Sequence, residues 1–164
     1  MKEQNSQPDV GKLIQQLVEL LQNGHAHVTL NDAVKDIPFE LLGKKPGGLT
    51  YSIWQIAEHI RIAQWDILDF SRNENYKEMN WPEDYWPHED APESEAAWND
   101  CIKQINEDQG SFIDLLHAHA ADLFKPISHG SGQTLLREAL LIADHNSYHV
   151  GQIVLIRRLL GNWN

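Results

Sequence analysis

The segment TLLREALLIADHNSYHVGQIVLIRRLLG, residues 134–161, is the longest stretch of the chain with a helical pattern, and it decides the fold. At about 1.5 Å per residue, it predicts a helix roughly 40 Å long. Its apolar residues point in nearly every direction, and a helix that is apolar all round is buried on more than one side. Arg157 and Arg158 place positive charge at the C-terminal end of the helix dipole. We therefore expect this helix to pack within its own chain and against a second subunit, in a homodimer.

Three other segments carry apolar residues at the spacing of amphipathic helices. In the second of them, Ser52 followed by Gln55 fits a capping box, which marks the start of a helix. No strand, internal repeat or low-complexity tract is evident. The chain is thus predicted to be all-α, a four-helix bundle that forms one domain over residues 1–164. The predicted helices cover residues 10–21 with a stop at Gly24, 52–71, 94 to before Pro126, and 134–161.

The connections between these helices are long. Residues 23–50 contain Pro and Gly residues that break regular structure, with one short helical turn expected over residues 31–36. Residues 72–93 form an aromatic-rich connector between the second and third helices. Because unstructured connections beyond about 12 to 15 residues are uncommon and often functional, its rings are expected either to border a site or to plug one end of the core. Its aromatic residues are Tyr76, Trp81, Tyr85 and Trp86.

Composition excludes several classes of function. The formal net charge is −11, which is the wrong sign for neutralising phosphates, so neither nucleic acid nor an anionic membrane is an expected partner. No apolar run reaches the roughly 18 residues that span a bilayer, and the first residues lack a signal-peptide pattern, so a cytoplasmic location is expected. The single cysteine, Cys101, cannot form an internal disulfide or a thiolate cage. Any metal would be held by nitrogen and oxygen ligands.

Two histidines of the last predicted helix, His145 and His149, are four residues apart in DHNSYHVGQ. This spacing puts both imidazoles on one face, one turn apart, where they can chelate a single ion. Zinc proteases use the same spacing with a Glu after the first histidine, and Asn146 at that position excludes this class. A third histidine, His59 in WQIAEHIRIAQW, lies among apolar residues and needs a polar partner. The alternative is that these histidines are neutral core residues with ordinary hydrogen bonds.

Six further histidines fall in predicted loops or near a helix end, and we expect them to be ordinary solvated residues. They are His25, His27, His88, His117, His119 and His129.

The segments SIWQIAEHI, residues 52–60, and HNSYHVGQI, residues 145–153, resemble the two signature segments of the DinB-like and YfiT-like metalloenzymes. The resemblance extends over essentially the whole chain. It implies a four-helix bundle in which one histidine of the second helix and two of the fourth bind a divalent metal. Carried over to this sequence, those ligands are His59, His145 and His149. Relatives include thiol-dependent transferases and isomerases, so the resemblance also implies a low-molecular-weight thiol such as bacillithiol or mycothiol.

Three neutral histidines leave coordination positions for water or substrate, as in catalytic metal sites. We therefore expect a divalent-metal-dependent enzyme that activates a thiol or water for transfer to a small electrophilic substrate. The alternative is a non-catalytic bundle that binds a metal or a ligand. Zinc is the first choice of metal and nickel the second. Gln55 lies one turn from His59, and Asn146 and Gln152 lie three residues from His149, so each is a candidate to support a ligand, with ordinary surface or bundle packing as the favoured alternative. Asp66 and Glu138 are seven residues from ligand histidines, so they would line the cavity only at a distance.

Overall fold

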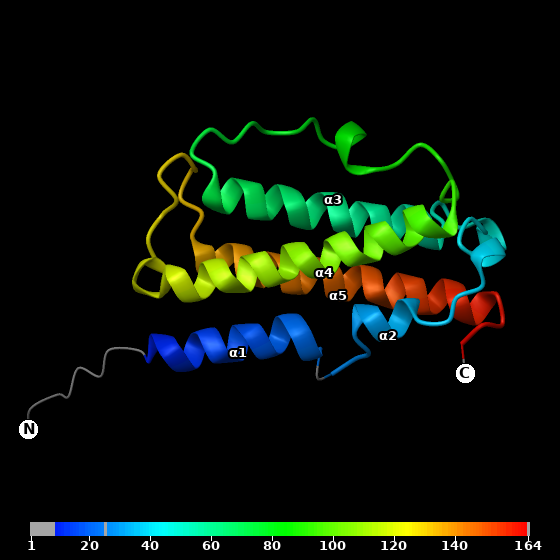
Figure 1. Ribbon diagram of the computed structural model, residues 1–164, viewed down its shortest axis with the longest axis horizontal. Coiled ribbons are helices and arrows are strands. Elements are labelled where there is room, and N and C mark those ends of the chain that lie inside the picture. Colours follow the sequence, from blue (N-terminus) through cyan, green and yellow to red (C-terminus); the bar gives the residue numbers. More distant parts are fainter. Residues whose placement is uncertain (1–8, 25, 164) are drawn as a thin grey trace, which may run out of the picture.

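The computed structural model describes residues 9–24 and 26–163, and in these residues the chain is helical without a β-strand (Figure 1). His25 lies outside them, so its predicted solvation is not addressed by the structure. Short 3-10 turns cover residues 39–41, 46–48, 83–85 and 120–122. The α-helices are α1 (Val10–Asn23), α2 (Leu30–Val34), α3 (Ile53–Arg72), α4 (Glu95–Ala118) and α5 (Leu135–Leu159).

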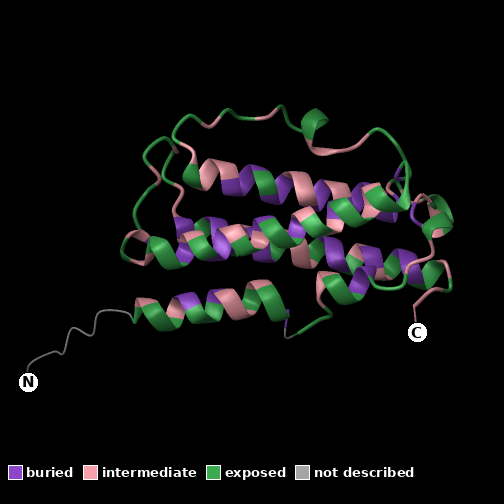
Figure 2. Cartoon of the chain, in the orientation of Figure 1, coloured by how far each residue is buried: buried purple, intermediate pink, exposed green. Residues whose placement is uncertain are grey.

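The helix α3 packs against both α4 and α5, and α1 lies alongside α4 and α5 (Figure 1). The short helix α2 packs on α5 next to α1. Residues 73–94 follow the outer side of α3 on their way back to the start of α4 (Figure 1). Purple segments in Figure 2 show that buried residues concentrate where the long helices face one another. The buried residues of α3 and α5 include polar ones, among them His59, Gln64 and His149.

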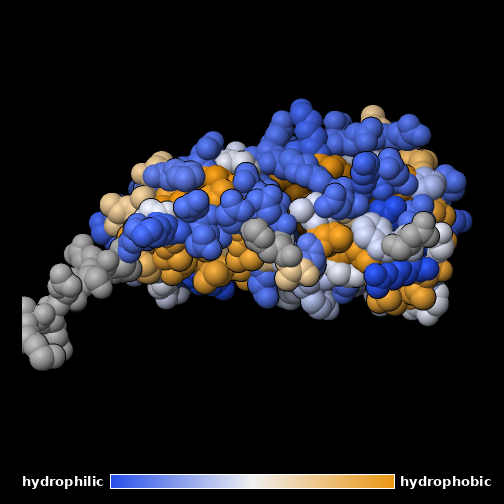
Figure 3. Space-filling model, turned by 90° about the horizontal axis from the view of Figure 1, so that it is seen from below, coloured by the Kyte–Doolittle hydropathy of each residue, from blue (hydrophilic) through white to orange (hydrophobic). Residues whose placement is uncertain are grey.

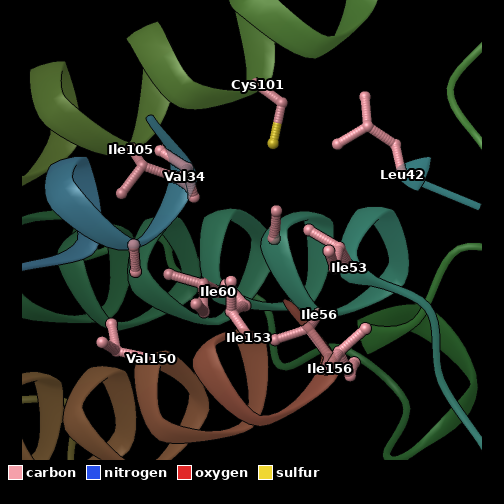
Figure 4. Close-up of a cluster of buried hydrophobic side chains, with 12 residues drawn as sticks. Val34, Leu42, Ile53, Ile56, Ile60, Cys101, Ile105, Val150, Ile153 and Ile156 are labelled. Carbon is pink, nitrogen blue, oxygen red and sulfur yellow. The ribbon is translucent and has the colours of Figure 1, made fainter. Parts of the chain in front are cut away.

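Two apolar clusters stabilise this arrangement. The first, drawn in Figure 4, joins α2, α3, α4 and the C-terminal half of α5. The second joins α1, the C-terminal part of α3, the end of α4 and the N-terminal half of α5. On α5, Ile142 belongs to the second cluster and Val150 to the first, and His145 and His149 come between them. The histidines thus lie where the two cores meet.

The helix starts follow the sequence signals. Ser52 and Gln55 form the predicted capping box, since each side chain accepts a hydrogen bond from the backbone N–H of the other. Thr134 caps α5 by accepting from the N–H of Arg137. In α1 the predicted apolar face is incomplete, because Leu20 remains 41% exposed.

The C-terminal ends of α4 and α5 have features that the sequence did not predict. The helix α4 stops at Ala118, and the 3-10 turn after it places Leu123 in the second core with no exposed surface. Arg157 and Arg158 lie in the last turn of α5, as expected for residues that complement the helix dipole, but Arg157 is also buried and makes specific contacts. It donates to the carbonyl of Ala33 at 2.8 Å and lies over the ring of Trp163. Arg157 therefore ties α2 and the C-terminal residues to α5.

None of the helices in residues 9–24 and 26–163 is long and apolar enough to cross a membrane. The cytoplasmic location stays a prediction. Figure 3 shows the face on the side of α1 and α2, where hydrophobic residues are interspersed with polar ones.

Candidate metal centre

The structure brings His59, His145 and His149 together between α3 and α5. One ring nitrogen from each lies within 4.8 Å of the others, so the group could hold a metal ion. The Nε2 atoms of His59 and His145 are 3.0 Å apart. Two nitrogens bound to one tetrahedral zinc ion at normal bond lengths are about 3.3 Å apart. The spacing of the rings is therefore close to what a shared ion requires.

The other nitrogen of each ring is held by an oxygen. Nδ1 of His59 donates to the carbonyl of Tyr85 at 2.9 Å, and Nδ1 of His149 donates to Oε1 of Gln152 at 2.7 Å. A longer contact of 3.4 Å joins Nδ1 of His145 to Oδ1 of Asn146. A neutral imidazole has one N–H, so a proton on Nδ1 leaves Nε2 as a lone-pair acceptor. The Nε2 atoms are then the nitrogens that remain to bind an ion.

A chain of amides fixes the direction of the contact at His145. The side-chain NH2 of Asn146 donates to Oε1 of Gln64 at 2.8 Å, and the NH2 of Gln64 donates to the main-chain carbonyl of Ile105 at 2.6 Å. Because that carbonyl can only accept, the NH2 group of Gln64 must face it, and the oxygen of Gln64 must face Asn146. The NH2 group of Asn146 in turn must face Gln64. The oxygen of Asn146 is thereby left to accept from His145.

Burial keeps these imidazoles neutral. It lowers the pKa of His59 and of His149 to about 4, and it also lowers the pKa of His145. The hydrogen bond to Tyr85 opposes this effect at His59, whereas the neighbouring histidines add to it. Metal binding requires deprotonated nitrogens, so the site is in its binding form at neutral pH.

Aromatic rings from the connector cover the site. The ring of Trp86 stacks on His59 with a centroid distance of 3.8 Å and an angle of 2°, and Tyr51 stacks in turn on Trp86 at 3.8 Å. His59 is only 2% exposed as a result of this packing. Of the two roles considered for the aromatic connector, the contact of Trp86 favours the one at the border of a site. Trp81, by contrast, is largely exposed.

The polar residues expected near the site have different roles. Gln152 holds His149 as anticipated, but Asn146 contacts His145 rather than His149. Gln55 belongs to the capping box and donates to the carbonyl of Pro87 at 3.4 Å, with no hydrogen bond to His59. The side chains of Asp66 and Glu138 line a cavity beside the histidines.

Two supporting residues were not identified from the sequence. Gln64 is a buried amide among apolar neighbours of α3, and this polar position on an apolar face was its only signal. Tyr85 contributes its main-chain carbonyl to His59. Every residue has such a carbonyl, so the residue type gives no signal for this contact.

Five of the other histidines lie in the described residues, and all five are exposed. His88, His117 and His119 agree with the expectation of solvated residues. His27 contacts the hydroxyl of Ser147 at 3.0 Å, and His129 donates to the carbonyl of Phe70 at 2.8 Å, so both also brace neighbouring segments. None of the five joins the group of three in the part of the chain described.

Comparison with known proteins identifies the family. No curated protein and no solved structure matches this chain. A model of the DinB superfamily matches residues 22–153, a range that includes both segments on which the resemblance was based. The match covers most of the sequence and all three clustered histidines. The chain therefore belongs to the DinB superfamily.

Proposed function

We propose that this protein is a divalent-metal-dependent enzyme in which His59, His145 and His149 bind the ion. The proposal rests on the orientation of the three rings. Each Nδ1 faces an oxygen acceptor, and one ring nitrogen from each histidine lies within 4.8 Å of the others in a largely buried group. Lone pairs that meet away from water have no favourable partner, and a cation among them supplies one.

The donor set favours zinc, with nickel as second choice, because imidazole suits both ions. A structural zinc site usually has four protein ligands, whereas three ligands leave a position for water or substrate. The group contains three histidines and no fourth His, Cys, Asp or Glu among the described residues. This supports a catalytic centre.

A divalent ion in such a site supplies Lewis acidity that activates a thiol or a water molecule toward a small electrophilic substrate. The residues of the chain keep the imidazoles neutral, orient them through Tyr85, Asn146 and Gln152, and exclude bulk water with the ring of Trp86. We propose a low-molecular-weight thiol as the co-substrate, on the basis of the family resemblance.

Elemental analysis tests the metal. Untagged protein purified without added metal is expected to contain about one equivalent of zinc, or of nickel, per chain. A chain that holds no metal as purified and takes up none from micromolar zinc or nickel would contradict the proposal.

Cobalt substitution tests the chemistry. Millimolar 2-mercaptoethanol is expected to change the d–d spectrum of the cobalt protein by adding a sulfur ligand, and His149→Ala should remove this response. Ethylene glycol, which has no sulfur, serves as the matched control. A spectrum indifferent to the thiol would favour water activation or the alternative of a non-catalytic metal- or ligand-binding bundle.

We also propose that the four long helices form the four-helix bundle of the family, with residues 72–93 as its aromatic connector, and that two copies associate. Support for the homodimer comes from α5, where Tyr148, Leu155 and Leu159 are exposed at spacings of seven and four residues. Such residues share one side of a helix, and a second copy related by two-fold symmetry would cover them. Light scattering should give twice the 18.8 kDa chain mass, and Leu155→Glu should reduce it to that of one chain.

A further inference from the structure

A cavity of about 500 Å³ lies beside the histidine group, along the same two helices. Its volume is in the range of small-molecule pockets. Asp66 and Phe70 of α3 line one side, Glu138 of α5 lines another, and Tyr76 and Tyr85 come from the connector. None of the three clustered histidines lines it. The cavity is thus a separate space from the candidate metal centre.

Asp66 places a buried carboxyl group in the wall of this cavity. Its two oxygens accept hydrogen bonds from the hydroxyl of Tyr76 at 2.9 Å and from the hydroxyl of Tyr85 at 2.7 Å. Burial and the bond to Asp66 both raise the pKa of each tyrosine, so the phenols stay protonated and donate. Both oxygens of Asp66 are therefore held as acceptors by phenol donors.

Glu138 adds a second carboxylate, with only 1% of its surface exposed. Its Oε1 accepts from Arg137 at 2.8 Å, while no described residue donates to its Oε2. Burial raises the pKa of Glu138; Arg137 opposes this rise, and the charge of Asp66 adds to it. The side chain of Arg137 is 55% exposed, so water solvates much of its charge. The second oxygen of Glu138 is therefore left to accept a hydrogen bond from water or from a ligand in the cavity.

Aromatic rings complete the walls. Phe70 and Tyr76 meet edge to face at 5.3 Å, and the ring of Tyr85 lies in the same lining. Aromatic faces attract cations, and they also cover the apolar part of a ligand. The lining also contains Glu78 and Arg137, so among the described residues three carboxyl side chains stand against one guanidinium. This excess of acidic groups beside aromatic walls suits a positively charged organic group better than an anion.

We propose that this cavity binds a small organic cation, namely a protonated primary amine with an apolar substituent. The ammonium group donates to the free Oε2 of Glu138 and lies near the charge of Asp66. The substituent packs against Phe70 and Tyr76. The inference does not depend on the proposed metal chemistry, because the carboxylates and rings that carry it are not ligands of the histidine group.

Two probes of equal length and opposite charge test the proposal. Isothermal titration of the full chain with 2-phenylethylamine at pH 7 should show saturable binding, and 3-phenylpropionate should bind at least about tenfold more weakly. The amine result should be unchanged after treatment with a chelator. Loss of amine binding on chelation would place the amine on the metal and overturn the proposal.

Binding to variants tests whether the amine lies in this cavity. Glu138→Gln should weaken its binding by about tenfold or more, while Glu89→Gln, which removes an exposed charge outside the cavity, should leave it unchanged. Thermal unfolding shows whether Glu138→Gln is folded. If it is not, Phe70→Leu replaces it and should weaken binding several-fold. Equal binding of both probes, full amine affinity in the folded variant, or no amine binding at about 10 mM would each overturn the proposal.

Discussion

The histidine group and the acidic cavity are built by the same two helices, α3 and α5, but they bury polar side chains in opposite ways. The imidazoles are neutral because burial lowers their pKa, and each ring turns one N–H to an oxygen acceptor. In the cavity, both oxygens of Asp66 accept hydrogen bonds from phenols. The histidine group thus presents uncharged nitrogen lone pairs, whereas the cavity presents carboxyl groups in a larger space.

Tyr85 joins the two regions. Its main-chain carbonyl accepts from His59, and its hydroxyl donates to Asp66. The first contact depends on the path of the backbone, whereas the second depends on the residue type. The histidine group contains no Lys or Arg, whereas the described lining of the cavity has one cationic side chain, Arg137, which pairs with Glu138. The two regions therefore suit different cations. The three nitrogens of the histidine group suit a metal ion, and the carboxylates and aromatic rings of the cavity suit an organic ammonium group.

Loss of a clustered imidazole should have the largest effect. His145→Ala removes one of three nitrogens, so the metal content should fall from about one equivalent to near zero, a loss of more than about 100-fold in affinity. Elemental analysis after gel filtration measures this. His117→Ala, at an exposed position of α4, should keep its full content. Undiminished metal in His145→Ala would refute the assignment of His145, and amine binding should be the same in both variants.

The neutral imidazoles should make the metal-free protein sensitive to acid. The pKa of His59 and of His149 is about 4 in the folded chain, against about 6.5 in an unfolded one. Below pH 6.5 the unfolded chain therefore binds more protons than the folded chain, and stability is lost as the pH falls toward 4. Urea unfolding at pH 7.5 and pH 5 should differ by several kcal/mol in the free energy of unfolding.

Replacing one of these histidines measures its contribution to the pH dependence of the free energy of unfolding. His149→Asn should reduce the pH dependence by about one proton, while His117→Asn should leave it unchanged. An unaltered slope in His149→Asn would contradict the lowered pKa. For the same reason, metal binding to the folded chain should persist to about pH 5, below the range near pH 6.5 that an ordinary histidine would give.

Local signals account for the parts of the structure that the sequence predicted. Helix α3 begins at Ile53, directly after its N-cap Ser52, and the sequence predicted this start because the capping box is contained in four consecutive residues. The i, i+4 spacing places His145 and His149 on one side of α5 in any helix. Their approach to His59 required either the tertiary structure or the resemblance to the family, because no spacing relates residues on different helices.

The contacts that support the histidines could not be predicted from the sequence, for a different reason. Trp86 reaches His59 through the path of a connector that has no periodicity, and Gln64 acts through an amide chain that ends on the main chain of α4. Arg157 was predicted from its place near a helix end, but its contact is with α2, far away in the sequence. Each case depends on packing between segments that the chain order does not bring together.

The orientation of His149 offers a smaller and more specific test of the histidine group. Gln152→Leu removes the acceptor of its Nδ1 proton but keeps the size of the side chain. Loss of such an acceptor typically weakens metal affinity by about 10 to 100-fold. Competition with a chromophoric chelator measures the change, with Gln16→Leu on the exposed side of α1 as the control. Equal affinity in both variants would show that Gln152 does not orient His149.

The smallest expected effect separates the two contacts of Tyr85. Tyr85→Phe removes the hydrogen bond to Asp66 but keeps the carbonyl that holds His59, and Tyr76→Phe removes only the other bond to Asp66. Each change should lower the free energy of unfolding by about 1 to 3 kcal/mol, since a hydrogen bond to a buried charge is lost. Metal affinity should stay within about twofold of the original in both. A large loss of metal in Tyr85→Phe alone would mean that the hydroxyl, and not only the main chain, positions the histidine, so that the two regions would be coupled through Asp66.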